Sequence, residues 1–135
     1  MDESTKRTYI HAHLTRTKDD LSIARDNLAH DHWRGAINRA YYAVFHAASA
    51  ALLWLGIERA RHSGIQAAFG EFLVKPRIIE AEFGRTYTKL RKARETQDYD
   101  LMAIEPTAEE AQNMVAEAEH FVSRLEDFLR QEGAL

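Results

Sequence analysis

The chain has 135 residues, of which 45% are hydrophobic and 29% charged, contains no cysteine and carries a net charge of −3. This length predicts one domain over residues 1–135, because half of it is too short to bury a core. The lack of cysteine excludes disulfide frameworks, thiolate metal sites and cysteine nucleophiles. No apolar run approaches the ~20 residues of a membrane-spanning helix, and the charged start MDESTKR is unlike a signal peptide. We therefore expect a globular, cytoplasmic protein without membrane contact.

The charge is spread unevenly along the chain. Residues 1–57 have a net charge of +1, residues 58–94 of +5 and residues 95–135 of −9. The stretch 83–94 has no acidic residue and holds five basic ones: Arg85, Lys89, Arg91, Lys92 and Arg94. Two interpretations of it stay open. It is either a solvated helix face that pairs with the acidic C-terminal segment or a local phosphate-binding patch.

The first two predicted helices cover residues 4–29 and 32–55. The first carries one apolar stripe at steps of three and four residues, with a polar back. The second is apolar around most of its circumference, which is typical of a central helix. We expect a turn at His30–His32, with Asp31 as the N-cap of the second helix. Gly56 is expected to end that helix in the left-handed conformation.

Two shorter helices are predicted to follow. Ser63 is expected to cap the third helix, and Pro76 to end it. The fourth helix contains the apolar positions from Ile79 onward and frays near Gln97. Asp98–Asp100 are therefore expected to lie in a loop.

The last predicted helix has the clearest start. Thr107 and Glu110 match the capping box, in which two side chains satisfy backbone N–H groups at the helix start. Apolar residues then step by three and four as far as Leu129. No segment shows the period-two alternation of a strand. The sequence therefore predicts an all-α, antiparallel up-and-down bundle of four to five helices.

The residues best suited to catalysis or phosphate binding lie in the middle of the second helix. At ~100° per residue, Arg39, Tyr42 and His46 fall on one stripe of that helix. An arginine can hold a phosphate with its planar fork, and a histidine can exchange protons near neutral pH. The alternative is that Arg39 pairs with a carboxylate of a neighbouring helix and that His46 is an ordinary core histidine.

Two further places have residues suited to phosphate. His62 lies at the start of the third helix, where free N–H groups attract anions. Arg91, Arg94 and Tyr99 lie near the end of the fourth helix, and an arginine beside a phenol can orient a phosphodiester. The alternatives are a surface histidine at an ordinary helix start, and an Arg94–Asp98 ion pair with Tyr99 packed on the bundle end.

The sequence contains no pattern that indicates a metal or cofactor site. The pairs His11/His13 and His30/His32 are two residues apart, and side chains at that spacing diverge on a helix. The chain has no Walker-type glycine loop, no dinucleotide-binding fingerprint and no nucleophile elbow. We expect neither a metal nor a cofactor.

The segment Arg39-Ala40-Tyr41-Tyr42-Ala43-Val44-Phe45-His46, followed by Ala51-Leu52-Leu53, resembles the HEPN family (higher eukaryotes and prokaryotes nucleotide-binding domain). The later features His62-Ser63-Gly64, Phe69 to Lys75, and Arg94 with Asp98-Tyr99-Asp100 occur in the family's order, so the resemblance covers residues 8–130. It implies a bundle of four to five helices, commonly a homodimer. Many members are metal-independent endoribonucleases and are encoded beside a minimal nucleotidyltransferase as toxin–antitoxin pairs.

The ribonuclease signature of the family is an arginine, four to six residues and a histidine, completed across a dimer interface. The histidine acts as acid and base, and the arginine stabilises the phosphate transition state. Arg39 and His46 match that spacing on an early helix, whereas Arg94 has the late position and is followed by Tyr99 instead of histidine.

The resemblance thus predicts a toxin-like protein that binds nucleotide or RNA, and cleavage of RNA stays open. The candidate catalytic residues are Arg94, Tyr99, Arg39 and His46. The candidate phosphate-binding residues are Arg94, Arg91, His62 and Tyr42. The alternative function is a non-catalytic helical module that binds nucleotide or a protein partner.

Overall fold

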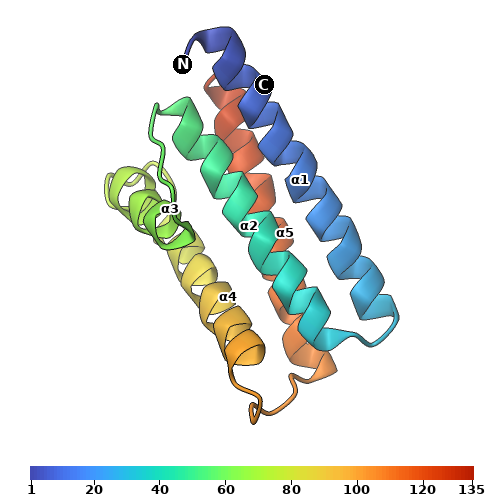
Figure 1. The fold of residues 1–135 in the computed structure, drawn as a ribbon. Coiled ribbons are helices and arrows are strands. Elements are labelled where there is room, and N and C mark those ends of the chain that lie inside the picture. The colour runs from blue at the N-terminus through green and yellow to red at the C-terminus, as the bar shows by residue number, and fades with distance from the viewer.

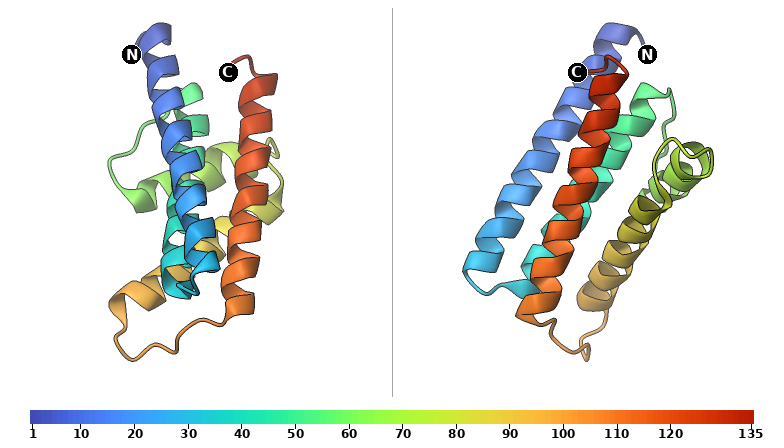
Figure 2. Two further views of the ribbon diagram at one scale, coloured as in Figure 1. Left: turned by 90° about the vertical axis from the view of Figure 1, so that its right-hand side faces the viewer. Right: turned by 180° about the vertical axis from the view of Figure 1, so that it is seen from behind.

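The computed structural model describes residues 1–135 and is built from helices alone. Their order is α1 (Glu3–Ala29), α2 (Trp33–Trp54), α3 (His62–Phe69), the π-helical turn η1 (Gly70–Val74), α4 (Ala81–Tyr99) and α5 (Ala108–Gln131). Helices α1, α2, α4 and α5 alternate in direction, and α3 with η1 forms a short insertion at one end of α4 (Figure 1). Both chain termini lie at the same end of the bundle (Figure 2). The predicted all-α antiparallel bundle is confirmed.

Helix α2 occupies the centre because its small side chains let other helices approach closely. The buried face includes seven fully covered alanines: Ala36, Ala40, Ala43, Ala47, Ala48, Ala50 and Ala51. Helix α2 contacts α1, α3, α4 and α5. The apolar surface that encircles it is therefore covered within this one chain and needs no second copy. None of the helices combines the length and apolar composition that crossing a bilayer requires.

Two predicted helix ends are confirmed by the backbone. Gly56 follows α2 with a φ of +79°, a left-handed conformation that glycine adopts without the steric cost of a Cβ atom. At the start of α5, the Glu110 N–H donates to Thr107 Oγ1 at 3.1 Å, which is one of the two bonds of the predicted capping box; the reciprocal bond from the Thr107 N–H to the Glu110 side chain is not formed. Pro76 also acts as expected, because η1 ends at Val74 and Arg77 turns the chain with a φ of +64°.

Two predicted caps are wrong. Asp31 does not cap α2, because it forms the preceding turn with a φ of +60°, and His32 takes the N-cap position without a side-chain bond. Ser63 does not cap α3, because the extended backbone at Arg61 begins the helix earlier and places Ser63 in the first turn. In both cases a neighbouring residue adopts the conformation that the helix start needs.

The expected loop at Asp98–Asp100 also begins later than predicted. Helix α4 continues to Tyr99, and the Asp100 N–H still donates to the Thr96 carbonyl at 3.2 Å. The last turn gains an i,i+4 ion pair, in which Arg94 Nη1 lies 3.3 Å from Asp98 Oδ2. This extra turn keeps Arg94 and Asp98 on one rigid element.

Candidate functional site

Side chains from three helices converge beside the middle of α2. Helix α1 supplies a buried carboxylate, α2 supplies an arginine, an amide and a histidine, and α4 supplies an arginine and a carboxylate. We call this group the arginine cluster; it consists of Asp20, Asn38, Arg39, His46, Arg94 and Asp98. The aromatic rings of Tyr41, Tyr42, His62 and Tyr99 surround it.

Arg39 is held in place by two neighbours. Its Nη1 donates to Asp20 Oδ1 at 3.1 Å, and its Nε and Nη2 donate to Asn38 Oδ1 at 3.1 and 2.8 Å. A guanidinium has five N–H donors, so these bonds leave two for a ligand. The side chain is 35% exposed, whereas that of Asp20 is 7% exposed. Arg39 therefore pairs with a neighbouring helix, as one interpretation expected, and still presents donors to solvent.

No sequence motif points to Asp20. Burial raises the pKa of its carboxyl group, and the charge and hydrogen bond of Arg39 act in the opposite direction. The signal available in the sequence is positional, because Asp20 lies three residues after the buried Thr17 and four before the buried Ala24. A carboxylate on the core side of an amphipathic helix needs a partner, and Arg39 is that partner.

His46 lies between Asp20 and a second histidine. Its Nε2 is 4.0 Å from Asp20 Oδ2, and its Nδ1 is 3.0 Å from His13 Nδ1. Burial, followed by the positive charges around it, lowers the pKa of His46 to about 4. Burial also lowers the pKa of His13. His46 is therefore neutral at pH 7, a state in which it can accept a proton. His13 was not a candidate, because only the packing of α1 on α2 brings it to His46.

Arg94 lies under a group of tyrosines. Its Cζ is 4.6 Å from the centre of the Tyr41 ring, 5.7 Å from that of Tyr42 and 5.9 Å from that of Tyr99. Its side chain is 11% exposed and pairs with Asp98, while its buried Nε has no hydrogen-bond partner. Tyr99 itself is 74% exposed. The alternative of an Arg94–Asp98 ion pair is therefore confirmed, whereas its second part is wrong, because Tyr99 covers Arg94 and otherwise extends into solvent.

The two arginines belong to one network. Asn38 accepts from Arg39 and donates through Nδ2 to Asp98 Oδ2 at 3.3 Å, and Asp98 in turn accepts from Arg94. Tyr42 lies against both guanidinium groups, with Arg39 Cζ 4.8 Å and Arg94 Cζ 5.7 Å from its ring centre. Residues that are far apart in the sequence thus present two cations around one aromatic ring.

His62 is close to the cluster, and Arg91 is not part of it. The His62 ring centre lies 4.1 Å from that of Phe45 and 5.8 Å from that of Tyr42. Burial and the charge of Arg94 lower the pKa of His62. Arg91 instead pairs with Glu95 at 3.1 Å and lines a groove beside α3. Arg91 thus forms its ion pair with a residue outside the arginine cluster.

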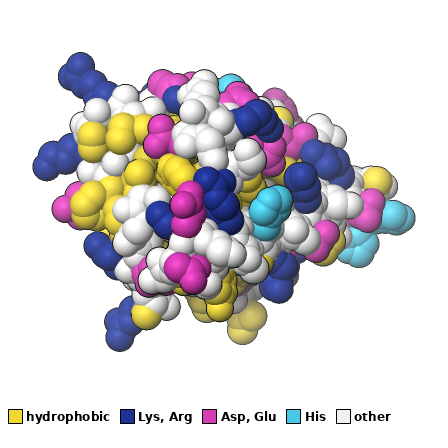
Figure 3. Space-filling view, turned by 90° about the horizontal axis from the view of Figure 1, so that it is seen from above, with side chains coloured by type: hydrophobic (Ala, Val, Ile, Leu, Met, Phe, Trp, Pro, Cys, Tyr) yellow, Lys and Arg dark blue, Asp and Glu magenta, His cyan; other side chains and the backbone are white.

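The basic stretch of α4 is partly neutralised. Lys89 Nζ lies 3.0 Å from Glu117 on α5, which is the pairing with the acidic C-terminal segment that one interpretation expected. Arg85 and Lys92 make no ion pair and line a groove on the outer side of α4. From above the bundle, cationic and acidic side chains are mixed over the surface (Figure 3). On this face, acidic side chains therefore interrupt the positive charge.

The sequence matches the family model described as "HEPN domain" over residues 10–128. The chain belongs to the HEPN family. The relative "Putative toxin MJ0605" of Methanocaldococcus jannaschii is 36% identical over 125 residues, 93% of this chain and 92% of that protein. A "UPF0332 protein" of Thermotoga maritima is 32% identical over 114 residues, 84% of this chain and 86% of that protein. The resemblance seen in residues 39–53 is confirmed, and the whole arginine cluster lies within the matched HEPN region.

Proposed function

We propose that this HEPN protein binds RNA or nucleotide at the arginine cluster and is the toxin-like component of a pair with a nucleotidyltransferase antitoxin. The observation that carries the proposal is the convergence of Arg39, His46 and Arg94 on one network around Tyr42. The relatives named as toxins support the toxin-like role.

The cluster has the chemistry that single-stranded RNA needs. Arginine forks bind phosphate oxygens through parallel hydrogen bonds, and exposed aromatic rings stack on bases. Arg39 keeps two free N–H donors, and Tyr99 offers an exposed ring beside Arg94. Asp98 is the carboxylate that a phosphate would replace at Arg94.

We propose a metal-independent cleavage in which the 2′-hydroxyl of RNA attacks its own phosphorus. His46 first leaves its contact with His13, which frees the Nδ1 lone pair. Neutral His46 then takes the proton of that hydroxyl, and Arg39 stabilises the charge on the phosphate oxygens. The P–O5′ bond breaks, a 2′,3′-cyclic phosphate forms, and the Tyr99 phenol gives its proton to the leaving 5′ oxygen. Tyr99 thus acts where the family signature has histidine.

One observation favours binding without cleavage. The His46 side chain is only 16% exposed and lies between His13 and Asp20, which leaves a ribose hydroxyl little access to it. The second candidate function is therefore a non-catalytic HEPN module that holds RNA or nucleotide on the two arginines.

An RNA cleavage and binding assay with EDTA present separates the two functions. We expect the native protein to cleave single-stranded RNA, and His46→Gln to bind it with unchanged affinity but cleave at least 100-fold more slowly. Binding by the native protein with no cleavage, alone or with a co-expressed nucleotidyltransferase, supports the second candidate. Absence of binding contradicts both.

We also propose that the protein acts as a homodimer. Because α2 is covered within the chain, its apolar residues do not carry this proposal. The proposed dimer interface is instead the segment between α4 and α5, where Leu101, Met102 and Ile104 are almost fully exposed beside Tyr99. Light scattering at micromolar concentration should show a mass of about twice 15.5 kDa. A mass of 15.5 kDa alone contradicts the dimer.

A further inference from the structure

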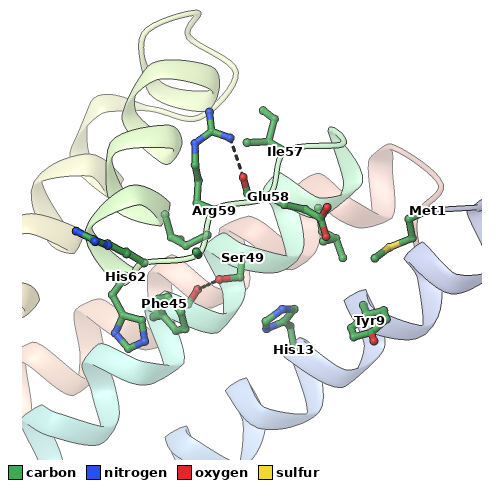
Figure 4. A pocket seen from close by; sticks show the side chains of 13 residues that line it. Met1, Tyr9, His13, Phe45, Ser49, Ile57, Glu58, Arg59 and His62 are labelled. Carbon is green, nitrogen blue, oxygen red and sulfur yellow. Dashed lines mark hydrogen bonds between the residues drawn. The ribbon is translucent and has the colours of Figure 1, made fainter.

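A cavity of about 310 Å³ lies between α1, α2 and the segment that leads into α3 (Figure 4). Helix α1 supplies Tyr9 and His13, and α2 supplies Phe45 and Ser49. His62 also lines the cavity and contacts Phe45. His13 touches His46 of the arginine cluster, so the cavity adjoins the cluster through this pair of histidines.

The walls of the cavity suit a small planar molecule. Seven of the 13 lining residues are hydrophobic, and they include the rings of Tyr9 and Phe45 and the aliphatic side chains of Leu53, Ile57 and Ile65. Ligand sites of this size are typically apolar, with a few polar groups that fix orientation. The volume is at the lower end of the usual range, so it admits a single ring system and excludes a helix or a duplex.

The hydrogen-bond network determines what His13 presents to the cavity. Asp20 is paired with Arg39, and its carboxylate favours an N–H on the facing Nε2 of His46. The 3.0 Å contact between the two Nδ1 atoms needs one donor and one acceptor, and we assign the hydrogen to His13 because Asp20 favours the hydrogen of His46 on Nε2. The remaining nitrogen of His13, Nε2, therefore carries a lone pair.

Two further polar groups, Ser49 and Glu58, also present acceptors. The Ser49 hydroxyl donates its hydrogen to the Phe45 carbonyl at 2.8 Å and keeps only lone pairs for a ligand. Glu58, at the rim, adds a carboxylate (Figure 4). Arg59 and Arg61 lie at the same rim and supply positive charge. The cavity thus selects a planar molecule rich in N–H donors and tolerates a nearby anion.

We propose that this cavity is a nucleobase subsite that takes an amino-bearing base, unstacked from single-stranded RNA or belonging to a free mononucleotide. The assignment rests on the proposed function, because it places the adjoining phosphate on Arg39 and Arg94. Cytosine presents an amino donor where uracil presents a carbonyl oxygen, so the acceptor set favours cytosine. Cytosine gains one hydrogen bond and avoids the repulsion that the uracil carbonyl oxygen would meet, so we expect about a tenfold preference for cytosine over uracil.

Anisotropy titrations with oligocytidylate, oligouridylate and a base-free ribose-phosphate oligomer test the subsite. We expect the native protein to bind oligocytidylate about tenfold more tightly than oligouridylate. Ala60→Trp places a bulky ring at an exposed position of the cavity lining. It should abolish that preference while leaving affinity for the base-free oligomer unchanged. Ala12→Trp, at an exposed position of α1 outside the lining, is the matched control and should keep the preference.

Tyr9→Ala is the second variant, because it removes a half-exposed wall and needs no insertion. Equal affinities for the two homopolymers would overturn the subsite, and so would a preference that survives both Ala60→Trp and Tyr9→Ala. In either case the proposed phosphate site still stands if the base-free oligomer binds. Titration with free cytidine and cytidine monophosphate shows whether the subsite works without a strand. If neither RNA nor cytidine binds the folded native protein, both proposals fail.

Discussion

The low pKa of His46 predicts a loss of stability in mild acid. An unfolded histidine has a pKa of 6.5, and the folded value is about 4. Between these values the unfolded chain binds more protons at this position, so the contribution of His46 is present above pH 6.5 and is lost as the pH falls toward 4. At pH 5 the unfolded imidazole is almost fully protonated and the folded one mostly neutral. The free energy of unfolding should therefore drop by about 2 kcal/mol between pH 7.5 and pH 5 on account of His46.

Urea denaturation of the native protein and of His46→Gln, each at pH 7.5 and pH 5, measures this contribution. Glutamine fills similar space and does not titrate, so the pH-dependent loss should be smaller in the variant by about 2 kcal/mol, equivalent to about 7 °C in melting temperature. Comparing each protein with itself cancels the cost of the substitution. If both proteins lose the same stability between the two pH values, His46 is not the buried neutral imidazole described above.

Three further substitutions have defined outcomes. Asp20→Asn removes the negative charge that competes for Arg39 and should raise the affinity for single-stranded RNA two- to fivefold; a lower affinity in a folded variant would show that the charge of Asp20 aids binding. Gly56→Ala should cost about 1 kcal/mol in urea denaturation because φ is +79°, whereas Gly70→Ala, with φ of −63° and open space around it, should cost nothing. Equal costs for the two glycines would refute the conformational reason. Thr107→Ala should cost about 1 kcal/mol by loss of the α5 cap, and Thr107→Ser should restore it.

The helix pattern was predictable because it depends on local spacing. The 3.6-residue period places Arg39, Tyr42 and His46 on one stripe without knowledge of any other helix. Gly56 and Thr107 act through their own backbone and side chain, and both ends are where the sequence places them. Asp31 and Ser63 failed as caps because several neighbouring residues can begin a helix, and tertiary packing decides which one does.

The site was only partly predictable because its contacts join different helices. Asp20 and His13 reach α2 through the register of α1 on α2, which no spacing within one segment determines. The same holds for Arg94 beneath Tyr41, since that contact depends on how α4 packs beside α2. An acidic residue on a buried stripe is the one sequence signal that pointed toward the missing partner of Arg39.

The most direct test of phosphate recognition by the arginine cluster is the affinity of Arg94→Lys for the base-free ribose-phosphate oligomer. Lysine keeps the charge and loses the planar fork, so the affinity should fall about tenfold while the variant stays folded. Arg85→Lys, on the outer side of α4, is the control and should change the affinity less than twofold. If Arg94→Lys is folded and binds the oligomer as tightly as the native protein, Arg94 does not hold the phosphate and the central claim is contradicted.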